Sequence, residues 1–171
     1  MDPVSLVEIR RARTSDIKAI RALVDTYTAD RRLLSKATVT LYEAVQEFWV
    51  AVRTADERVV GCGALHVMWE DLAEIRTVAV DPACRGTKIG HRLVSELLGV
   101  ARELGVARVF CLTFETRFFG SFGFTEIDGA PVPHSVYEQL LRSYDEGVAE
   151  FLDLERVKPN TLGNTRMLLH L

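Results

Sequence analysis

The sequence predicts an α+β (mixed α/β) fold, with one central mixed β-sheet and helices on both of its faces. Segments of strand-like alternation and segments of helical periodicity follow one another along the chain. Two apolar, β-rich segments, 59–68 and 72–80, are separated by a short polar link and predict an antiparallel hairpin. A glycine-containing loop, a long apolar helix and the strand 107–112 then follow, which predicts a right-handed parallel βαβ unit.

The remaining elements follow from local signals. Thr14, Ser15 and Asp16 offer a helix N-cap, and Gly105 occupies the favoured position just after a helix. The expected strands are 6–13, 48–53, 59–68, 72–80, 107–112, 124–127 and 166–171. The expected helices are 16–28, 41–48, the apolar pattern from 90 to 104, a short helix within 113–123, and 135–154.

Length and composition are those of an ordinary globular chain. The 171 residues match one domain of roughly 100 to 200 residues, so we expect a single domain spanning 1–171. Hydrophobic residues make up 48% and charged residues 26%, which excludes a disordered or fibrous protein. The net charge of −3 supplies no general basic field for nucleic acid, so no nucleic-acid partner is expected.

Cysteine usage and hydropathy restrict the setting of the protein. Cys62, Cys84 and Cys111 form no C-x-x-C pair and have no histidine at zinc-ligand spacing, so we expect reduced thiols and no metal. No apolar run reaches the roughly 18 residues of a membrane helix, and Met1–Val7 lacks the pattern of a signal peptide. A cytoplasmic protein without a membrane partner is therefore expected.

The most informative segment is the loop D-P-A-C-R-G-T-K-I-G at 81–90, which joins a buried strand to a long helix. The first amides of a helix lack partners and the helix dipole adds positive charge, so such a junction binds phosphate or pyrophosphate. A plain strand-to-helix turn holding two glycines remains the alternative. The candidate cofactor-binding residues are Val78, Ala79, Val80, Arg85, Gly86, Thr87, Lys88, Ile89, Gly90 and His91.

The run V-A-V-D-P-x-x-R-G-x-x-I-G, followed by an apolar helix, resembles motif A of the GNAT acyltransferase superfamily. A later F-F-x-x-x-G-F segment at 118–124 strengthens the resemblance. It implies a single GNAT-like domain whose loop amides hold the pyrophosphate of acetyl-CoA, the cosubstrate. Lys88 stands where the family has a glycine. We expect Lys88 in the first helical turn with a negative φ, where its side chain is sterically allowed.

Acetyl transfer to an amine requires a base, because only the neutral amine attacks a thioester. Glu74 is the candidate base, since it lies four residues before Val78 and period-2 alternation places both on one strand face, with Arg76. The resemblance gives the backbone amide of Val78 as the donor to the oxyanion. The alternative for Glu74 is a surface carboxylate paired with Arg76.

Several segments are similar to the short, stand-alone amino-acid N-acetyltransferases, the N-acetylglutamate synthase group. They are L-L-S-K at 33–36, the hairpin, L-T-F-E-T-R-F-F at 112–119, and the tail K-P-N-T-L-G-N-T-R-M at 158–167. The similarity implies that Thr116 lies near the family's serine acid and that Lys36 meets a substrate carboxylate. Arg166 or Lys158 would supply the second carboxylate contact, and Arg76 adds a further cation. The usual GNAT tyrosine acid is missing from this chain.

The resulting hypothesis is direct transfer of acetyl from acetyl-CoA to the α-amine of L-glutamate or L-glutamine. With glutamate the product would be the N-acetylglutamate of arginine biosynthesis. The cysteines show no histidine partner, which disfavours a covalent acyl-enzyme. One alternative is a GNAT enzyme for another amine: a protein N-terminus, a lysine, a polyamine or an antibiotic. A second is a non-catalytic acyl-CoA-binding module. Pairing into a homodimer is left open.

Overall fold

The computed structural model describes residues 6–28, 37–161 and 163–171. Within these residues seven strands form one sheet in the order β1-β2-β3-β4-β5-β7-β6. The strands are β1 (Val7–Arg11), β2 (Phe48–Arg53), β3 (Arg58–Trp69), β4 (Leu72–Val80), β5 (Arg108–Thr113), β6 (Thr125–Glu126) and β7 (Thr165–His170). β4 and β5 pair in parallel, whereas β1 with β2 and β5 with β7 are antiparallel, so the predicted mixed sheet is confirmed.

Seven α-helices lie in the described residues. They are α1 (Ile17–Thr28), α2 (Thr38–Glu43), α3 (Ile89–Leu104), α4 (Thr116–Gly120), α5 (His134–Leu140), α6 (Glu146–Phe151) and α7 (Lys158–Thr161). The chain divides into two compact units, both made of two segments. The first unit is Met1–His66 with Thr77–Val100, and the second is Val67–Arg76 with Ala101–Leu171.

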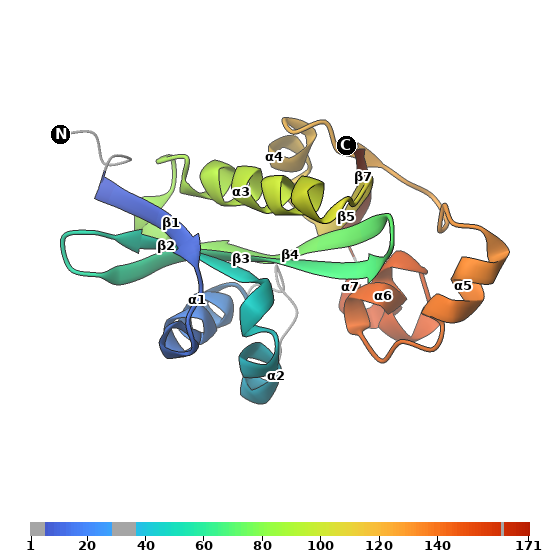
Figure 1. Ribbon diagram of the computed structural model, residues 1–171, viewed down its shortest axis with the longest axis horizontal. Helices are drawn as coiled ribbons and strands as arrows, with labels where there is room; N and C mark the ends of the chain where they lie inside the picture. Colours follow the sequence, from blue (N-terminus) through green and yellow to red (C-terminus); the bar gives the residue numbers. More distant parts are fainter. Residues whose placement is uncertain (1–5, 29–36, 162) are drawn as a thin grey trace. The chain divides into compact units, whose positions relative to one another are not determined.

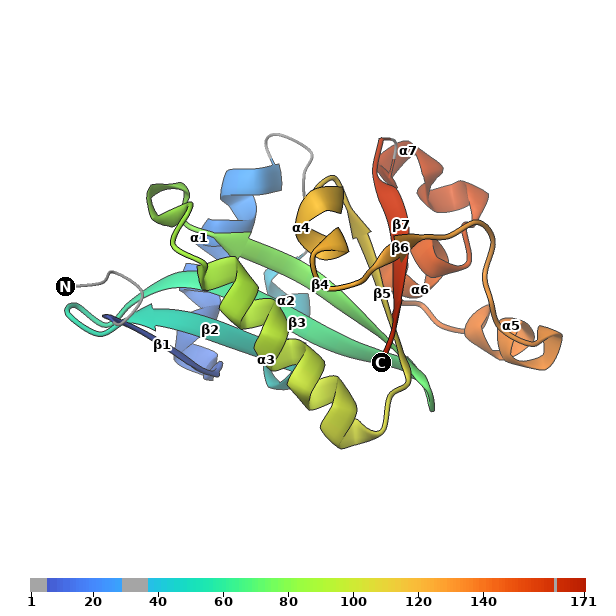
Figure 2. The ribbon, with the colours of Figure 1, turned by 90° about the horizontal axis from the view of Figure 1, so that it is seen from above.

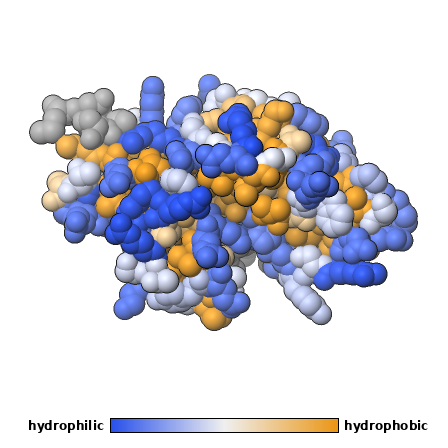
Figure 3. Space-filling model, in the orientation of Figure 1, coloured by the Kyte–Doolittle hydropathy of each residue, from blue (hydrophilic) through white to orange (hydrophobic). Residues whose placement is uncertain are grey.

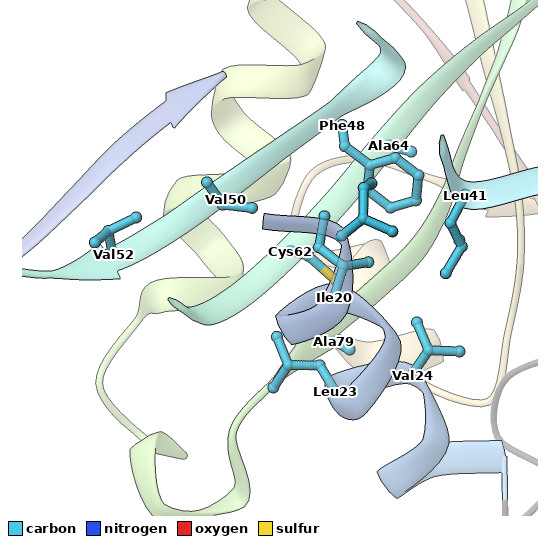
Figure 4. Close-up of a cluster of buried hydrophobic side chains, with 11 residues drawn as sticks. Ile20, Leu23, Val24, Leu41, Phe48, Val50, Val52, Cys62, Ala64 and Ala79 are labelled. Atoms are coloured by element: carbon cyan, nitrogen blue, oxygen red, sulfur yellow. The ribbon is translucent and has the colours of Figure 1, made fainter. Parts of the chain in front are cut away.

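The first unit is a layered structure in which helices cover both sheet faces. α1 and α2 lie on one face, and α3 lies on the other and runs across the strands (Figures 1 and 2). The apolar residues of α1 recur at helical spacing, so Ile20, Leu23 and Val24 all point at the sheet (Figure 4). There they pack with Phe48 and Val50 of β2. This buried stripe fixes α1 against the sheet.

On the opposite face, α3 approaches the sheet closely because β3 carries glycine there. Ile89 and Leu93 of α3 belong to a buried cluster with Val60 of β3. A Cβ added at Gly61 would lie 3.0 Å from both Ile89 Cγ2 and Leu93 Cδ1. A larger residue at position 61 would therefore push the start of α3, and the loop before it, away from the strands.

The second unit has a core of its own. Phe110 of β5 and Phe151 of α6 meet edge to face, with ring centroids 5.3 Å apart. The last strand, β7, lies between β5 and β6, and Met167 is paired with Cys111 on one side and Glu126 on the other. The C-terminal residues thus complete the sheet beside the βαβ unit.

Two predicted helices differ from the structure. The segment expected as one helix over 135–154 is two helices, α5 and α6, because Asp145 starts a new helix by accepting a hydrogen bond from Val148 N (3.1 Å). The helix expected over 41–48 begins three residues earlier, at Thr38, and α2 ends at Glu43. The short helix α7 was not predicted.

Polar and apolar residues are interspersed on the face drawn in Figure 3. The large apolar residues that are exposed include Val67 and Trp69 of the β3–β4 hairpin and Tyr144 before α6. None of the helices in the described residues is both long enough and apolar enough to cross a membrane.

An ion pair fixes the start of α1 and generates a prediction. Asp16 is buried and accepts hydrogen bonds from Arg10 Nη1 (2.8 Å), Arg10 Nη2 (3.0 Å) and Arg13 N (2.7 Å). Burial raises the pKa of Asp16, but these hydrogen bonds and the charge of Arg10 outweigh it and leave the pKa below its usual value.

We expect Asp16→Asn to lower the free energy of unfolding at pH 7 by about 2 kcal/mol, because charge-assisted hydrogen bonds are lost. A depressed folded-state pKa stabilises the protein above the unfolded value and ceases to do so as the pH falls through the folded value. The difference in free energy of unfolding between wild type and variant, measured by urea titration, should therefore become smaller as the pH is lowered from about 5 to 2. Asp25→Asn, which removes an exposed pair with Arg21, is the control. A gap that is constant with pH would contradict the assignment.

Candidate functional site

The end of β4 is anchored before the loop begins. The hydroxyl of Tyr27, on α1, donates a hydrogen bond to the carbonyl of Val80. The amide of Asp81 donates to the carbonyl of Val60 (2.8 Å). Val78, Ala79 and Val80 thus lead into the loop from a strand that is held from two sides.

The loop itself is shaped by short-range hydrogen bonds. The Asp81 carboxylate accepts from Ala83 N (3.0 Å) and caps the 3₁₀ turn Pro82–Cys84. The hydroxyl of Thr87 donates to the carbonyl of Cys84 (2.5 Å). The guanidinium of Arg85 lies 5.8 Å from the centre of the Tyr27 ring, so the side chain that anchors β4 also supports the arginine.

Lys88 lies before the helix and not in its first turn, so the expectation of a negative φ is wrong. Its φ is +64°, and that of Gly86 is +79°. The chain needs two left-handed residues to turn from the loop into α3, which begins at Ile89. An L-residue with a Cβ pays about 1–2 kcal/mol for that conformation, which explains why glycine suits this position.

The start of α3 offers backbone donors to an anion. The amide of Arg92 donates to the carbonyl of Lys88 (3.0 Å) and closes the first helical turn. The amides of Ile89 and Gly90 come before that of Arg92. Like the first amides of any helix, they have no carbonyl acceptor within the helix itself. A Cβ added at Gly86 would meet nothing within 4 Å, so the backbone there is open to close approach. This geometry fits the pyrophosphate of acetyl-CoA.

In the second unit, Glu74 of β4 is buried, with 3% of its surface exposed. Its Oε2 accepts hydrogen bonds from Nη2 (2.7 Å) and Nε (3.2 Å) of Arg76. The pairing with Arg76 that we considered as an alternative is present. Glu74 is nonetheless a buried carboxylate and not a surface one.

Asp145 completes this cluster, although it lies 69 positions from Arg76 in the sequence. Its Oδ1 accepts from Arg76 Nη1 (2.8 Å) and its Oδ2 from Arg76 Nη2 (2.5 Å). Burial lowers the pKa of Arg76, but attraction to Glu74 and hydrogen bonds to Asp145 outweigh it and raise the pKa above its usual value. Arg76 is therefore a permanent cation between two carboxylates.

Asp145 was not among the predicted site residues, because its position was expected in the interior of a continuous helix. The signal was present, since Asp145 precedes Glu146-Gly147, and aspartate is a favoured N-cap. The cluster around Glu74 contains two carboxylates and one guanidinium.

The regular alternation of β4 is interrupted between Glu74 and Val78. Thr77 has a φ of +58°, in the left-handed region. The inference that Glu74 and Val78 share one face rested on unbroken alternation, so it no longer follows from their spacing. A residue of this kind inside a strand changes the direction of the groups that follow it.

The predicted carboxylate-binding residues have different surroundings. The guanidinium of Arg166 donates from Nε to Glu150 O (3.0 Å) and from Nη2 to Gly129 O (2.8 Å) and to Phe151 O. This arrangement ties α6 to β7 and does not support the prediction that Arg166 holds a substrate carboxylate. Lys158 pairs with Asp153 (2.8 Å). Lys36 lies outside the described residues.

The hydroxyl and thiol candidates are also placed. Thr116 is exposed at the first position of α4, whereas Thr113 is buried and its hydroxyl accepts from Glu115 N (2.8 Å). Burial raises the pKa of Cys62 to about 12, and burial together with the charge of Glu74 raises that of Cys111. Both thiols stay protonated at neutral pH and are poor nucleophiles. Among the described residues, no cluster of histidine, cysteine and acidic side chains could hold a metal ion.

A βαβ unit whose loop turns into the long helix α3, in a mixed sheet of this order, is the arrangement typical of an acyltransferase that uses an acyl-CoA. The chain belongs to the Acetyltransferase (GNAT) family, which it matches over residues 17–124. It is therefore an enzyme whose cosubstrate is acetyl-CoA.

Two relatives at the sequence level are amino-acid acetyltransferases. That of Mycobacterium tuberculosis is 65% identical over 162 residues, which cover 94% of this chain and 92% of that protein. One from Neisseria meningitidis is 30% identical over 133 residues, which cover 77% of this chain but only 30% of that protein.

The solved structures that resemble the chain include two with coenzyme A bound. A crystal structure of Rv2747 from Mycobacterium tuberculosis in complex with CoA and the ligand designated NLQ has a TM-score of 0.92 and 65% identity. The match covers 96% of this chain and 99% of that one. N-acetylglutamate synthase from Neisseria gonorrhoeae, complexed with coenzyme A and N-acetyl-glutamate, has a TM-score of 0.76 and 24% identity. The match covers 96% of this chain and 35% of the synthase chain, and it shows that the two share a fold.

The left-handed conformation of Lys88 generates a prediction. We expect Lys88→Gly to raise the free energy of unfolding by about 1 kcal/mol, because glycine adopts a positive φ without strain. Lys88→Ala keeps the strain and should give no such gain, which makes it the matched control. Urea unfolding compares the three proteins. If alanine stabilises as much as glycine, the gain does not come from the backbone. Calorimetry with coenzyme A shows separately whether the lysine charge contributes to binding.

Proposed function

We propose that this enzyme acetylates the α-amine of L-glutamate or L-glutamine, with Glu74 as the general base. With glutamate the product is N-acetylglutamate, which serves arginine biosynthesis. The observation that carries the proposal is a buried glutamate on β4 in a chain that is 65% identical to a named amino-acid acetyltransferase. The gonococcal synthase complexed with N-acetyl-glutamate supports glutamate as the first substrate to test.

The proposed reaction is a direct transfer. Glu74 takes a proton from the amino-acid ammonium, and the neutral nitrogen forms a bond to the thioester carbonyl carbon. The backbone amide of Val78 donates to the oxyanion as negative charge develops there. The carbon–sulfur bond then breaks and the sulfur leaves as a thiolate, while the nitrogen gives up its second proton to solvent and becomes the amide nitrogen. The thiolate takes up a proton through the hydroxyl of Thr116, the proposed donor, which regains one from solvent. A thiol with a pKa of about 8.5 leaves readily, so a weak donor is sufficient.

A covalent acyl-enzyme on Cys62 or Cys111 is disfavoured by the burial of these two thiols. A cysteine must be a thiolate to attack a thioester at a useful rate. The raised pKa values of Cys62 and Cys111 keep both protonated. Direct attack by the amine requires neither thiol.

The charge of the Glu74 cluster supports a substrate that arrives as an ammonium. With Asp145 and Arg76, the cluster carries one net negative charge. This charge attracts the ammonium end of an amino acid. The proposed partner of a substrate carboxylate is Lys36, since the guanidinium of Arg76 is already held by Glu74 and Asp145.

The substrate proposal predicts a selective amino-acid profile. Thiol release from acetyl-CoA should be fastest with glutamate or glutamine at millimolar concentration, and slower with aspartate, with lysine and with a polyamine. Comparing glutamate with glutamine shows whether the enzyme prefers a substrate with a side-chain carboxylate or one with a side-chain amide. No turnover with either would eliminate this substrate class. Turnover confined to a peptide N-terminus, a lysine, a polyamine or an antibiotic would instead indicate a GNAT enzyme that acetylates another kind of amine.

The assignment of the base predicts the behaviour of Glu74→Gln. We expect kcat to fall by about 10²- to 10⁴-fold, because the amide cannot accept the ammonium proton. The Kd for coenzyme A from calorimetry should stay within about twofold, since the amides of the loop are unchanged. Asp71→Asn is the matched control, because it removes a carboxylate paired with an arginine on neighbouring β5. Full activity of Glu74→Gln would exclude Glu74 as the base.

A further inference from the structure

We propose that Asp145 is a positioning residue, which acts through Arg76 to keep Glu74 available as a base. The inference rests on the proposed function of Glu74. It assigns a role to a side chain that does not itself accept the substrate proton.

The hydrogen bonds of Arg76 divide the guanidinium between two carboxylates. Toward Asp145 the contact is a fork, in which Nη1 meets Oδ1 (2.8 Å) and Nη2 meets Oδ2 (2.5 Å). Toward Glu74 both hydrogen bonds end on the same oxygen, Oε2, and neither uses Oε1. The two-oxygen pairing that an arginine usually makes with one carboxylate is thus made with Asp145.

This division matters because a carboxylate bound by both oxygens to a guanidinium is a poor proton acceptor. Two parallel charge-assisted hydrogen bonds engage the lone pairs that a substrate proton would need. If Asp145 did not hold Arg76, the guanidinium would be free to turn its fork onto Glu74. Asp145 therefore limits how tightly Arg76 binds the base, while Arg76 still stabilises the buried negative charge.

Burial strengthens these constraints. The side-chain exposures are 4% for Glu74, 11% for Arg76 and 24% for Asp145. Little water reaches the Glu74–Arg76 contact, so the guanidinium must find its partners in the protein. Removing Asp145 should therefore change the geometry of the contact between Arg76 and Glu74. At an exposed ion pair, water would replace the lost partner and the remaining contact would be unaffected.

A second observation shows that Asp145 is held in place by the fold. Asp145 is the N-cap of α6, since its Oδ2 also accepts from Val148 N (3.1 Å). Gly147, in the first turn of α6, lies against the ion pair. A Cβ added there would overlap Glu74 Oε2 and Arg76 Nη2 and would lie 2.9 Å from Glu74 Cδ. The glycine lets the helix backbone approach the pair and bring Asp145 to Arg76.

The first test is Asp145→Asn, with thiol release measured against the amino acid that the substrate panel selects. Asparagine is as good an N-cap as aspartate, so α6 should be retained. It presents one carbonyl oxygen and cannot hold the Arg76 fork. We expect kcat to fall roughly ten- to a hundredfold, as for other misplaced catalytic groups. The Kd for coenzyme A should be unchanged.

The decisive measurement combines this change with Glu74→Gln. If Asp145 acts through Arg76 on Glu74, the double variant should be no slower than Glu74→Gln alone. A purely structural role would instead lower kcat by the same factor in both backgrounds, and that result would overturn the proposal. If Asp145→Asn does not fold, Arg76→Lys replaces it in the cycle, because an ammonium has no planar fork to share between two carboxylates.

Glu146→Gln is the matched control. Glu146 follows Asp145 directly, is exposed and pairs with Arg156 (2.7 Å) rather than with Arg76. The kcat of Glu146→Gln should equal that of the wild type, and a loss as large as that of Asp145→Asn would also overturn the inference.

The proposal for Glu74 and the proposal for Asp145 can fail separately. Full activity of Glu74→Gln removes the base, whereas a slow Glu74→Gln with a fully active Asp145→Asn removes only the role of Asp145.

Discussion

A carboxylate is stable in a protein interior only if positive charge and hydrogen bonds replace the water that it loses. Glu74, at 3% exposure, meets this requirement through Arg76. Arg76 in turn is buried enough to need both Glu74 and Asp145 as partners. This requirement links β4 to the start of α6, and Gly147 leaves the space in which they meet. The local order of the second unit and the proposed chemistry of Glu74 therefore depend on the same set of hydrogen bonds.

The loop between β4 and α3 depends on a different constraint, which is backbone conformation. To pass from the end of β4 into α3, the chain uses left-handed residues at Gly86 and Lys88. Side chains then hold the turn in place, with Tyr27 bonded to the Val80 carbonyl and Thr87 to the Cys84 carbonyl. A lysine at a position suited to glycine adds strain to the turn.

The parts of the fold that the sequence predicted well are those set by neighbouring residues. The hairpin of β3 and β4 and the unit β4-α3-β5 follow from hydrophobic period and from short polar links. The prediction of one helix over 135–154 was wrong, because helical periodicity does not reveal that Asp145 caps a new helix. The insertion of β7 between β5 and β6 joins residues far apart in sequence, which no local pattern specifies.

For the site, the sequence by itself determined the loop and the candidate base, since each is a short run whose chemistry is readable in order. Only the tertiary structure decided how these groups are used. It placed the Arg166 guanidinium against backbone carbonyls, gave Lys88 a positive φ, and brought Asp145 to Arg76 across 69 positions. Periodicity reports which side of an element faces the core. It carries no information on which distant side chain will satisfy a buried charge, because that choice is made when the elements pack.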